Sequence, residues 1–95
     1  MSAFEWDEAK NASNLEKHGV SFEEAREIFN GPVLEGSEEF HGAEMRVRSF
    51  GLLGGIVVVC VVYTERGGKT RIISARKATR AERNLFNDYL RKATH

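Results

Sequence analysis

The stretch IVVVCVVY at residues 56–63 decides the fold, because six of its eight residues are β-branched. β-Branched side chains favour extended strands. Side chains alternate between the two faces of a strand, so a stretch that is apolar at every position is apolar on both faces. We therefore predict that residues 56–63 form the central strand of a sheet, covered by helices on at least one face.

The segment on the N-terminal side of this strand has the pattern of a half-buried strand. Over residues 44–50 the charged residues Glu44, Arg46 and Arg48 alternate with apolar ones, a period of two that is typical of a strand with one face in the core. The glycine pair at 54–55 supplies the residues that a tight hairpin turn needs. This segment and the central strand are therefore predicted to form a hairpin.

Two more strands are predicted further out along the chain. Residues 33–35 indicate a short strand, and residues 38–42 indicate a polar turn. On the C-terminal side, residues 66–69 contain a second glycine pair and predict another hairpin turn, which leads into a last strand at residues 70–77. Strands that follow one another through short turns pair antiparallel, so we expect a four-stranded antiparallel sheet.

The first helix is indicated by signals at both of its ends. Asp7 is a good N-cap, because its carboxylate can accept from the free amides of the first turn. The helix then covers residues 8–18, and Gly19 fits the left-handed position that follows a helix end.

Two other helices begin with capping boxes. Ser21 and Glu24 have the S-x-x-E spacing, and residues 30–32, Asn-Gly-Pro, end that second helix. Thr79 and Glu82 have the equivalent spacing at the start of the last helix. The predicted apolar faces of these two helices consist of Phe22, Ala25, Ile28 and Phe29, and of Leu85, Phe86, Tyr89 and Leu90.

These elements predict an α+β fold with two N-terminal helices, an antiparallel four-stranded sheet and a C-terminal helix. At 95 residues the chain is expected to be a single domain over residues 1–95. The hydrophobic fraction of 41% and the charged fraction of 29% are those of an ordinary globular domain and exclude a disordered chain. The apolar run at residues 52–63 is shorter than the roughly 20 residues that span a bilayer, so no membrane partner is expected.

The charges are divided unevenly although the chain has no net charge. Residues 1–44 contain eleven acidic and three basic residues, and residues 45–95 contain three acidic and eleven basic residues. This division indicates one partner or substrate that is anionic and another that is cationic. Alternatively, the two halves neutralise each other across the fold.

Several kinds of chemistry are disfavoured by the residues. The only cysteine, Cys60, lies in the apolar stretch, where its thiol is expected to be buried, protonated and unable to act as a nucleophile. The three histidines, His18, His41 and His95, have no metal-ligand spacing, so no metal or cofactor is expected. The first residues have neither the positive nor the apolar segment of a secretory signal, which predicts a cytoplasmic protein.

The strongest chemical signal is a basic cluster near the C-terminus. Seven cations lie within eighteen residues: Arg66, Lys69, Arg71, Arg76, Lys77, Arg80 and Arg83. Arginine suits phosphate, and the helix that begins here adds free amides. Arg71 and Arg76 differ in parity, so they share one face of the last strand only if a bulge intervenes. The cluster indicates nucleic-acid or phosphate binding. Alternatively, it is a solvated basic edge, or its arginines pair with the acidic N-terminal half.

Two separated blocks of the chain resemble the BrnT family. The first consists of Phe4-Glu5-Trp6-Asp7, Lys10, Asn14, residues 17–20 and Phe22, and the second of residues 62–66, residues 71–78, Arg80 and Glu82. The resemblance extends from about residue 4 to residue 83. The family comprises toxins of type II toxin–antitoxin pairs, with a fold similar to RelE-type ribonucleases, and its members are neutralised by a ribbon-helix-helix antitoxin, BrnA.

The resemblance implies a cytoplasmic ribonuclease toxin that inhibits translation and growth. Its expected partners are RNA, a BrnA-like antitoxin and, through the antitoxin complex, operator DNA. RNA can be cut without a metal ion if its own 2′-hydroxyl attacks the adjacent phosphorus while the protein moves protons and stabilises charge. A non-catalytic module of the same fold, binding nucleic acid or protein, is the alternative.

The candidate site residues have distinct expected roles. Arg66, Arg76 and Arg80 are candidates for stabilising charge on the phosphate. The proton acceptor is left open among Glu65, Glu44, His18 and Lys10, although His18 can instead favour a helix dipole and Glu44 can instead pair with an arginine across strands. Trp6 and Tyr63 either stack on bases or belong to the core. The predicted catalytic set is Arg76, Arg66, Glu65, Lys10 and His18, and the predicted RNA- and phosphate-binding set is Arg71, Lys77, Arg80, Arg83 and Lys69.

Overall fold

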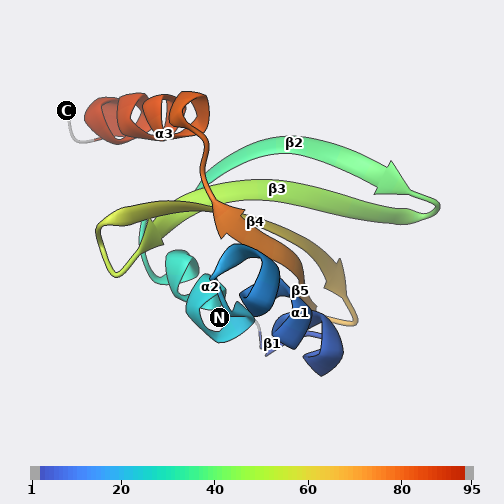
Figure 1. Cartoon of the computed structure of the whole chain (residues 1–95). Coiled ribbons are helices and arrows are strands. Elements are labelled where there is room, and N and C mark those ends of the chain that lie inside the picture. Colours follow the sequence, from blue (N-terminus) through green and yellow to red (C-terminus); the bar gives the residue numbers. More distant parts are fainter. Residues whose placement is uncertain (1–2, 94–95) are drawn as a thin grey trace.

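The computed structural model describes residues 3–93 and contains a five-stranded mixed sheet between helices (Figure 1). The strand order is β1-β5-β4-β3-β2. The strands are β1 (Phe4–Glu5), β2 (Leu34–His41), β3 (Glu44–Leu53), β4 (Val57–Arg66) and β5 (Lys69–Lys77). The helices are α1 (Glu8–His18), α2 (Phe22–Ala25), the 3-10 helix η1 (Arg26–Asn30) and α3 (Arg80–Ala93). No helix within residues 3–93 is long and apolar enough to cross a membrane.

The predicted central strand is confirmed as β4, and the four predicted strands pair antiparallel as expected. The prediction that the sheet contains only these four strands is wrong. A fifth strand, β1, pairs in parallel with β5, through Phe4 with Thr70 and Glu5 with Arg71. A strand of two residues is too short to have a recognisable alternation of side chains. Its pairing depends on a distant segment, so the sequence around it carries no signal for it.

The second correction concerns the outer strand, β2. A strand at 33–35 and a polar turn at 38–42 were expected, whereas β2 runs from Leu34 to His41, with a shift in its register against β3 between Glu35 and Glu38, and the chain turns at Gly42. Seven of its eight residues are exposed, because it lies at the edge of the sheet. Edge strands with both faces solvated lack the hydrophobic alternation that the prediction depends on.

Each face of the sheet carries its own apolar core. On the face toward α1 and α2, which we call the α1 face, Val59 and Val61 of β4 pack with Phe22 and Ile28. On the opposite face, the α3 face, Val58 and Cys60 of β4 pack with Phe86 and other buried residues. Figure 1 shows α1 and α2 on one side of the sheet and α3 on the other. The fully apolar stretch is therefore explained by helices on both sides of β4.

The helices agree largely with their end signals. The second helix changes to 3-10 geometry after Ala25, where Ile28 presses against β3. A Cβ on Gly51 would lie 2.6 Å from the Cβ of Ile28, so only glycine permits this close approach. On α3, Phe86 is buried as expected, but Leu85 is 61% exposed, which corrects its predicted place in the core. The helix contacts only one end of the sheet, so the flank that Leu85 occupies has nothing to pack against.

Buried asparagines attach α1 to the rest of the fold. The Asn14 amide donates to the carbonyls of Val20 (2.8 Å) and Ala75 (2.7 Å), and its oxygen accepts from the Ala75 amide at 3.2 Å. Asn11 accepts from the Phe22 amide at 2.8 Å. Strand β1 pairs with β5 only at Thr70 and Arg71, so Asn14 satisfies the edge of β5 where a neighbouring strand is missing.

A charged pair fixes the start of α3 to the end of β5. Arg76 donates to both carboxylate oxygens of Glu82, at 2.8 and 3.0 Å. Glu82 also accepts from the Thr79 amide at 2.8 Å, and its own amide donates to the Thr79 hydroxyl at 3.2 Å, which confirms the predicted capping box. The hydrogen bonds from Arg76 hold the pKa of Glu82 at about 2, far below its ordinary value. The same carboxylate therefore caps α3 and binds Arg76.

The Asn14 contacts predict a specific loss of stability. We expect Asn14→Ala to lower the free energy of unfolding by roughly 2–4 kcal/mol, because it leaves buried carbonyls and an amide without partners. Asn87→Ala, at an exposed position on α3, is the control and should change stability by about 0.5 kcal/mol or less. Urea denaturation of both variants measures the difference. Equal stability of the two variants would contradict the structural role of Asn14.

The pair of Arg76 and Glu82 predicts stability that depends on acid pH. The Glu82 carboxyl has a pKa of about 2 in the folded chain and 4.5 ordinarily, so its contribution is present above pH 4.5 and is lost as the pH falls toward 2. Glu82→Gln keeps a capping side chain but removes the charge. It should lower the free energy of unfolding at pH 7 by at most about 3 kcal/mol. Its thermal stability should fall less steeply than that of the wild type below pH 4.5. Glu16→Gln, at an exposed position, is the control and should keep the wild-type dependence of stability on pH. If Glu82→Gln also keeps the wild-type dependence, the assignment is refuted.

Candidate nucleic-acid interface

A bulge in β5 brings the arginines of this strand to one face. Ser74 pairs with Val62 of β4, but the next pair joins Ile72 to Tyr63, so β5 contains one extra residue at this point. Arg76 pairs with Cys60, and Arg71 pairs with Thr64. Cys60 and Thr64 have the same parity on β4, and paired residues point to the same face, so both arginines lie on the α3 face.

Other strands contribute arginines to the same face. Arg48 of β3 pairs with Val62, which lies on the α3 face, and Arg46 has the same parity as Arg48. Arg66 of β4 has the parity of Cys60 and so also lies on this face. The helix α3 packs over Val58, Cys60 and Phe50 at one end of the face and leaves the rest open. We call the open part the arginine face; it consists of Arg46, Arg48, Arg66, Arg71 and Arg76.

Most of these arginines are already paired with carboxylates. Nη1 of Arg71 lies 2.7 Å from Oε2 of Glu5 in β1. Glu44 pairs through both of its oxygens: Oε1 lies 2.7 Å from Nη2 of Arg66, and Oε2 lies 3.3 Å from Nη2 of Arg46. The hydrogen bond from Arg66 holds the pKa of Glu44 below its ordinary value. Both carboxylates come from the acidic N-terminal half, so the prediction that the halves neutralise each other holds for these pairs.

Arg48 is different, because no carboxylate within residues 3–93 lies at ion-pair distance from it. Its side chain lines a polar hollow of about 200 Å³ on the arginine face. The hollow is also lined by Ser37, Glu39 and His41 of β2, Arg46 of β3 and Ser74 of β5. It therefore combines positive charge with hydroxyl groups and an imidazole, which are the groups that bind a phosphodiester and move its protons.

The predicted phosphate-binding residues are divided between this face and its rim. Arg71 belongs to the arginine face, as do the predicted catalytic residues Arg66 and Arg76. Lys77 and Arg80 are exposed at the junction of β5 and α3, and Lys69 is exposed at the turn from β4 to β5. Arg83 donates to the carbonyl of Ala78 at 3.2 Å.

The three other predicted catalytic residues are not part of the arginine face. Lys10 and His18 are exposed on α1, on the opposite side of the sheet from the arginine face (Figure 1). Glu65 pairs with Thr70 and accepts from its hydroxyl at 3.0 Å, on the α1 face. Lys10 and His18 therefore lie apart from the arginines, whereas Glu65 lines a hollow of about 380 Å³ together with Arg66 and Glu44.

The aromatic candidates for base stacking belong to the α1-face core. Trp6 contacts the ring of Phe22 edge-on at 6.2 Å, and Tyr63 contacts Phe29 edge-on at 5.3 Å. The Tyr63 hydroxyl donates to Glu35 at 3.2 Å, and burial, together with the nearby carboxylates, raises its pKa to about 12. Of the two alternatives, the core location is correct.

The structure also places Cys60 and the residue types that could bind a metal ion. Burial raises the pKa of the Cys60 thiol, although Arg76 and Arg48 partly oppose the shift, so the prediction of a protonated thiol is confirmed. No group of three or more His, Cys, Asp or Glu residues within 3–93 is placed to hold a metal ion.

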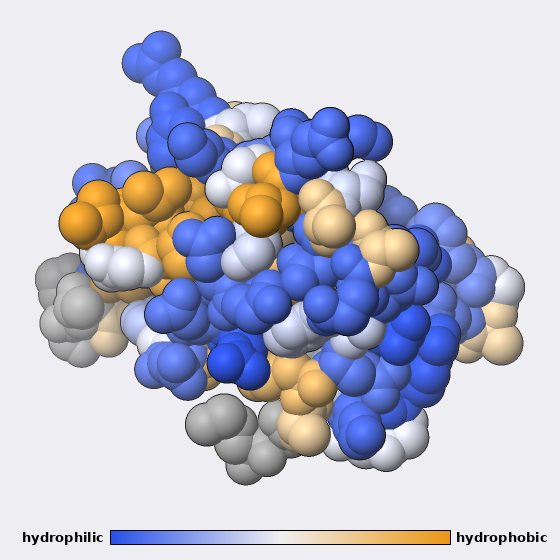
Figure 2. Space-filling model, turned by 60° about the horizontal axis from the view of Figure 1, so that its bottom comes forward, coloured by the Kyte–Doolittle hydropathy of each residue, from blue (hydrophilic) through white to orange (hydrophobic). Residues whose placement is uncertain are grey.

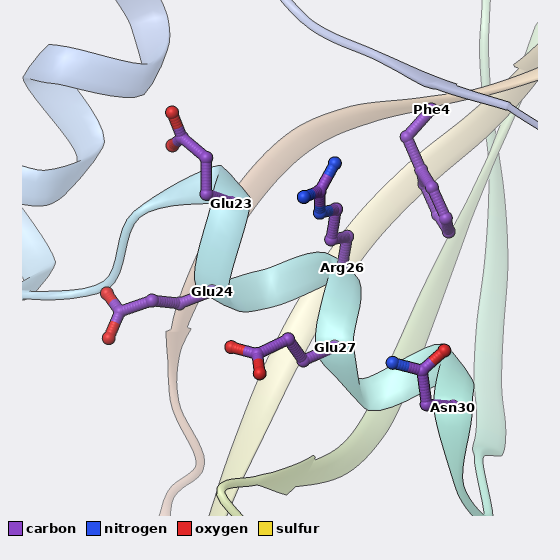
Figure 3. Close-up of a pocket in the computed structure, with 6 residues that line it drawn as sticks. All are labelled: Phe4, Glu23, Glu24, Arg26, Glu27 and Asn30. Atoms are coloured by element: carbon purple, nitrogen blue, oxygen red, sulfur yellow. The ribbon is translucent and has the colours of Figure 1, made fainter.

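Another hollow lies on the other side of the molecule and has the opposite charge. It measures about 480 Å³ and is lined by Glu23, Glu24, Glu27, Arg26, Asn30 and Phe4. Figure 3 shows that its carboxylates do not converge on one point. Figure 2, viewed from the side of α1 and α2, shows a mostly hydrophilic surface with apolar residues gathered toward the end that carries the β3–β4 turn. Neither feature suits an RNA phosphate.

Three residues that line the polar hollow, Arg46, Arg48 and His41, were not among the predicted catalytic or phosphate-binding residues. The first two were interpreted only as the polar side of a half-buried strand, although that side faces the cations of β5. His41 was considered only as a metal ligand. The missing information was the strand order, which places β2 and β3 beside β4 and β5.

The comparisons with known proteins agree with this fold. The family described as "Ribonuclease toxin, BrnT, of type II toxin-antitoxin system" matches residues 6–82. A 1.1 Å crystal structure of the Brucella abortus ribonuclease toxin BrnT is 26% identical to this chain, with a TM-score of 0.64. The match covers 84% of this chain and 100% of the Brucella chain. No curated protein sequence matches. The chain therefore belongs to the BrnT family of ribonuclease toxins of type II toxin–antitoxin systems.

Proposed function

We propose that this toxin is an endoribonuclease that binds RNA on its arginine face and cuts it without a metal ion. The observation that carries the proposal is Arg48, which opens onto the polar hollow with no carboxylate of residues 3–93 at ion-pair distance. Its guanidinium is free to bind a phosphate with two parallel hydrogen bonds. Arg46, beside it on β3, adds a second positive charge.

The chemistry that fits this surface is attack by the substrate itself. The 2′-oxygen of RNA attacks the adjacent phosphorus, and charge develops on the nonbridging phosphate oxygens. Arginines that are already in place stabilise that charge without reorganising, which lowers the barrier. Arg66, Arg71 and Arg76, although each is paired with a carboxylate, extend the positive surface along which the RNA strand lies.

The predicted proton acceptors are poorly suited to this surface. Glu44 lies on the correct side, but the hydrogen bond from Arg66 lowers the pKa of its carboxyl and makes it a weaker base. Lys10 and His18 lie on the opposite side of the sheet, and Glu65, although it lines a hollow with Arg66, is engaged by the Thr70 hydroxyl. The proton acceptor is therefore sought among the other groups that line the polar hollow.

The partners follow from the family. We propose a ribbon-helix-helix antitoxin similar to BrnA that covers the arginine face and blocks access of RNA. The toxin–antitoxin complex would bind operator DNA and repress its own operon, while the free toxin would act in the cytoplasm, cleave RNA, inhibit translation and arrest growth. Contacts of the antitoxin with exposed arginines should weaken as salt is added.

Purified toxin, free of antitoxin, should cleave total RNA in the presence of EDTA. We expect Arg48→Ala to lower the cleavage rate about 100- to 1000-fold, because it removes one preorganised group that stabilises the developing charge. The matched control is Arg26→Ala, which removes an exposed arginine from η1 on the other side of the sheet and should cleave at the wild-type rate. Gel electrophoresis of the RNA and circular dichroism of each variant provide the measurement.

Two outcomes would contradict the proposal in different ways. If the folded wild-type protein leaves RNA intact, the chain is a non-catalytic binding module of the same fold. If Arg48→Ala and Arg26→Ala both cleave as the wild type does, the protein is a ribonuclease whose active site lies outside the arginine face.

A further inference from the structure

The polar hollow contains an imidazole that no role assigned above uses. His41 is the last residue of β2 and lines the hollow together with Arg46 and Arg48. It pairs across the strands with Glu44. Its side chain is 50% exposed, so it is accessible to a bound ligand. Histidine is the side chain best able to accept and release a proton near neutral pH.

A carboxylate lies on one side of this imidazole. Oε2 of Glu39 is 3.7 Å from Nε2 of His41. Glu39 and His41 have the same parity on β2, and Glu39 pairs with Arg46, so both face the hollow. Glu39 lies on the Nε2 side of the ring, so Nδ1 is the ring nitrogen that is left to accept from a substrate hydroxyl.

The other charged groups around His41 complete the arrangement. Arg46 and Arg48 line the same hollow and can hold a phosphate beside the ring. Glu44, opposite His41, is engaged by Arg66 and Arg46, so its charge is largely compensated. The hollow thus places one proton acceptor, one orienting carboxylate and two phosphate-binding cations within a single small site.

We propose that His41 is the general base of RNA cleavage and that Glu39 is its positioning residue; this inference rests on the ribonuclease function proposed above. The 2′-hydroxyl gives its proton to Nδ1 of His41 while the 2′-oxygen forms a bond to phosphorus. The bond from phosphorus to the 5′ oxygen breaks, and that oxygen takes a proton from water. The products are a 2′,3′-cyclic phosphate and a 5′-hydroxyl, and His41 returns its proton to the solvent.

The test measures cleavage of a short RNA oligonucleotide by wild-type toxin and by variants of β2. His41→Ala should lower kcat about 100- to 10,000-fold, as expected for loss of a general base, while binding of a 2′-O-methylated, uncleavable RNA is retained. Added imidazole should restore part of the rate to His41→Ala. A merely structural role would not produce this rescue.

Neighbouring carboxylates supply the matched control. Glu39→Gln should reduce kcat, by less than the loss of His41 does, with little change in KM. Glu38→Gln alters the adjacent residue of the same strand, which pairs with Val47 on the α1 face, and should cleave at the wild-type rate.

The outcomes separate this inference from the proposed function. Cleavage by His41→Ala at the wild-type rate, or a loss that imidazole does not restore, would overturn the role of His41 and leave the ribonuclease function intact. If the wild-type protein itself does not cleave RNA, the proposed function fails and the assignment of His41 fails with it.

Discussion

The hydrogen bonds between Asn14 and Ala75 are the contact on which the rest of the structure depends. Asn14 binds both the amide and the carbonyl of Ala75, at the edge of β5 that no strand covers and next to the bulge in that strand. The contact satisfies the backbone of β5 on the edge away from β4. The bulge itself places Arg76 on the α3 face, where Arg71 also lies. A buried amide on the first helix thus binds the strand whose bulge gathers these arginines on the far side of the sheet.

The uneven distribution of charge along the chain corresponds to an uneven distribution of charge over the two faces of the sheet. Carboxylates of the N-terminal half surround the hollow at α2 and η1, and two others, Glu5 and Glu44, pair with arginines of the C-terminal half. These pairs orient Arg71 and Arg66 but reduce their capacity to attract a phosphate. Arg48 lacks such a pair within residues 3–93 and lies over the polar hollow. The neutral net charge is therefore compatible with a local surface for an anionic ligand.

The parts of the fold that local signals specify could be predicted, and the parts that depend on distant pairing could not. The capping residues Asp7 and Ser21 and the apolar stretch of β4 placed their elements correctly, because each acts through neighbours in sequence. Strand β1 and the exposed edge strand β2 have no such signal. The candidate site was predicted least well. His41 and Arg48 come close to β5 only through the strand order. Lys10 and His18 were grouped with the arginines because the sequence does not show that the sheet lies between them.

The claim that RNA lies on the arginine face can be tested most directly by mapping its contacts in solution. An RNA oligonucleotide methylated at its 2′-oxygens cannot be cut by 2′-oxygen attack, so it can be titrated into isotopically labelled toxin while backbone amide resonances are followed. Shifts concentrated in β3, β4 and β5 around Arg46, Arg48 and Ser74, with α1 unchanged, are the predicted result. Shifts concentrated in α1 around Lys10 and His18, with those strands unchanged, would contradict it.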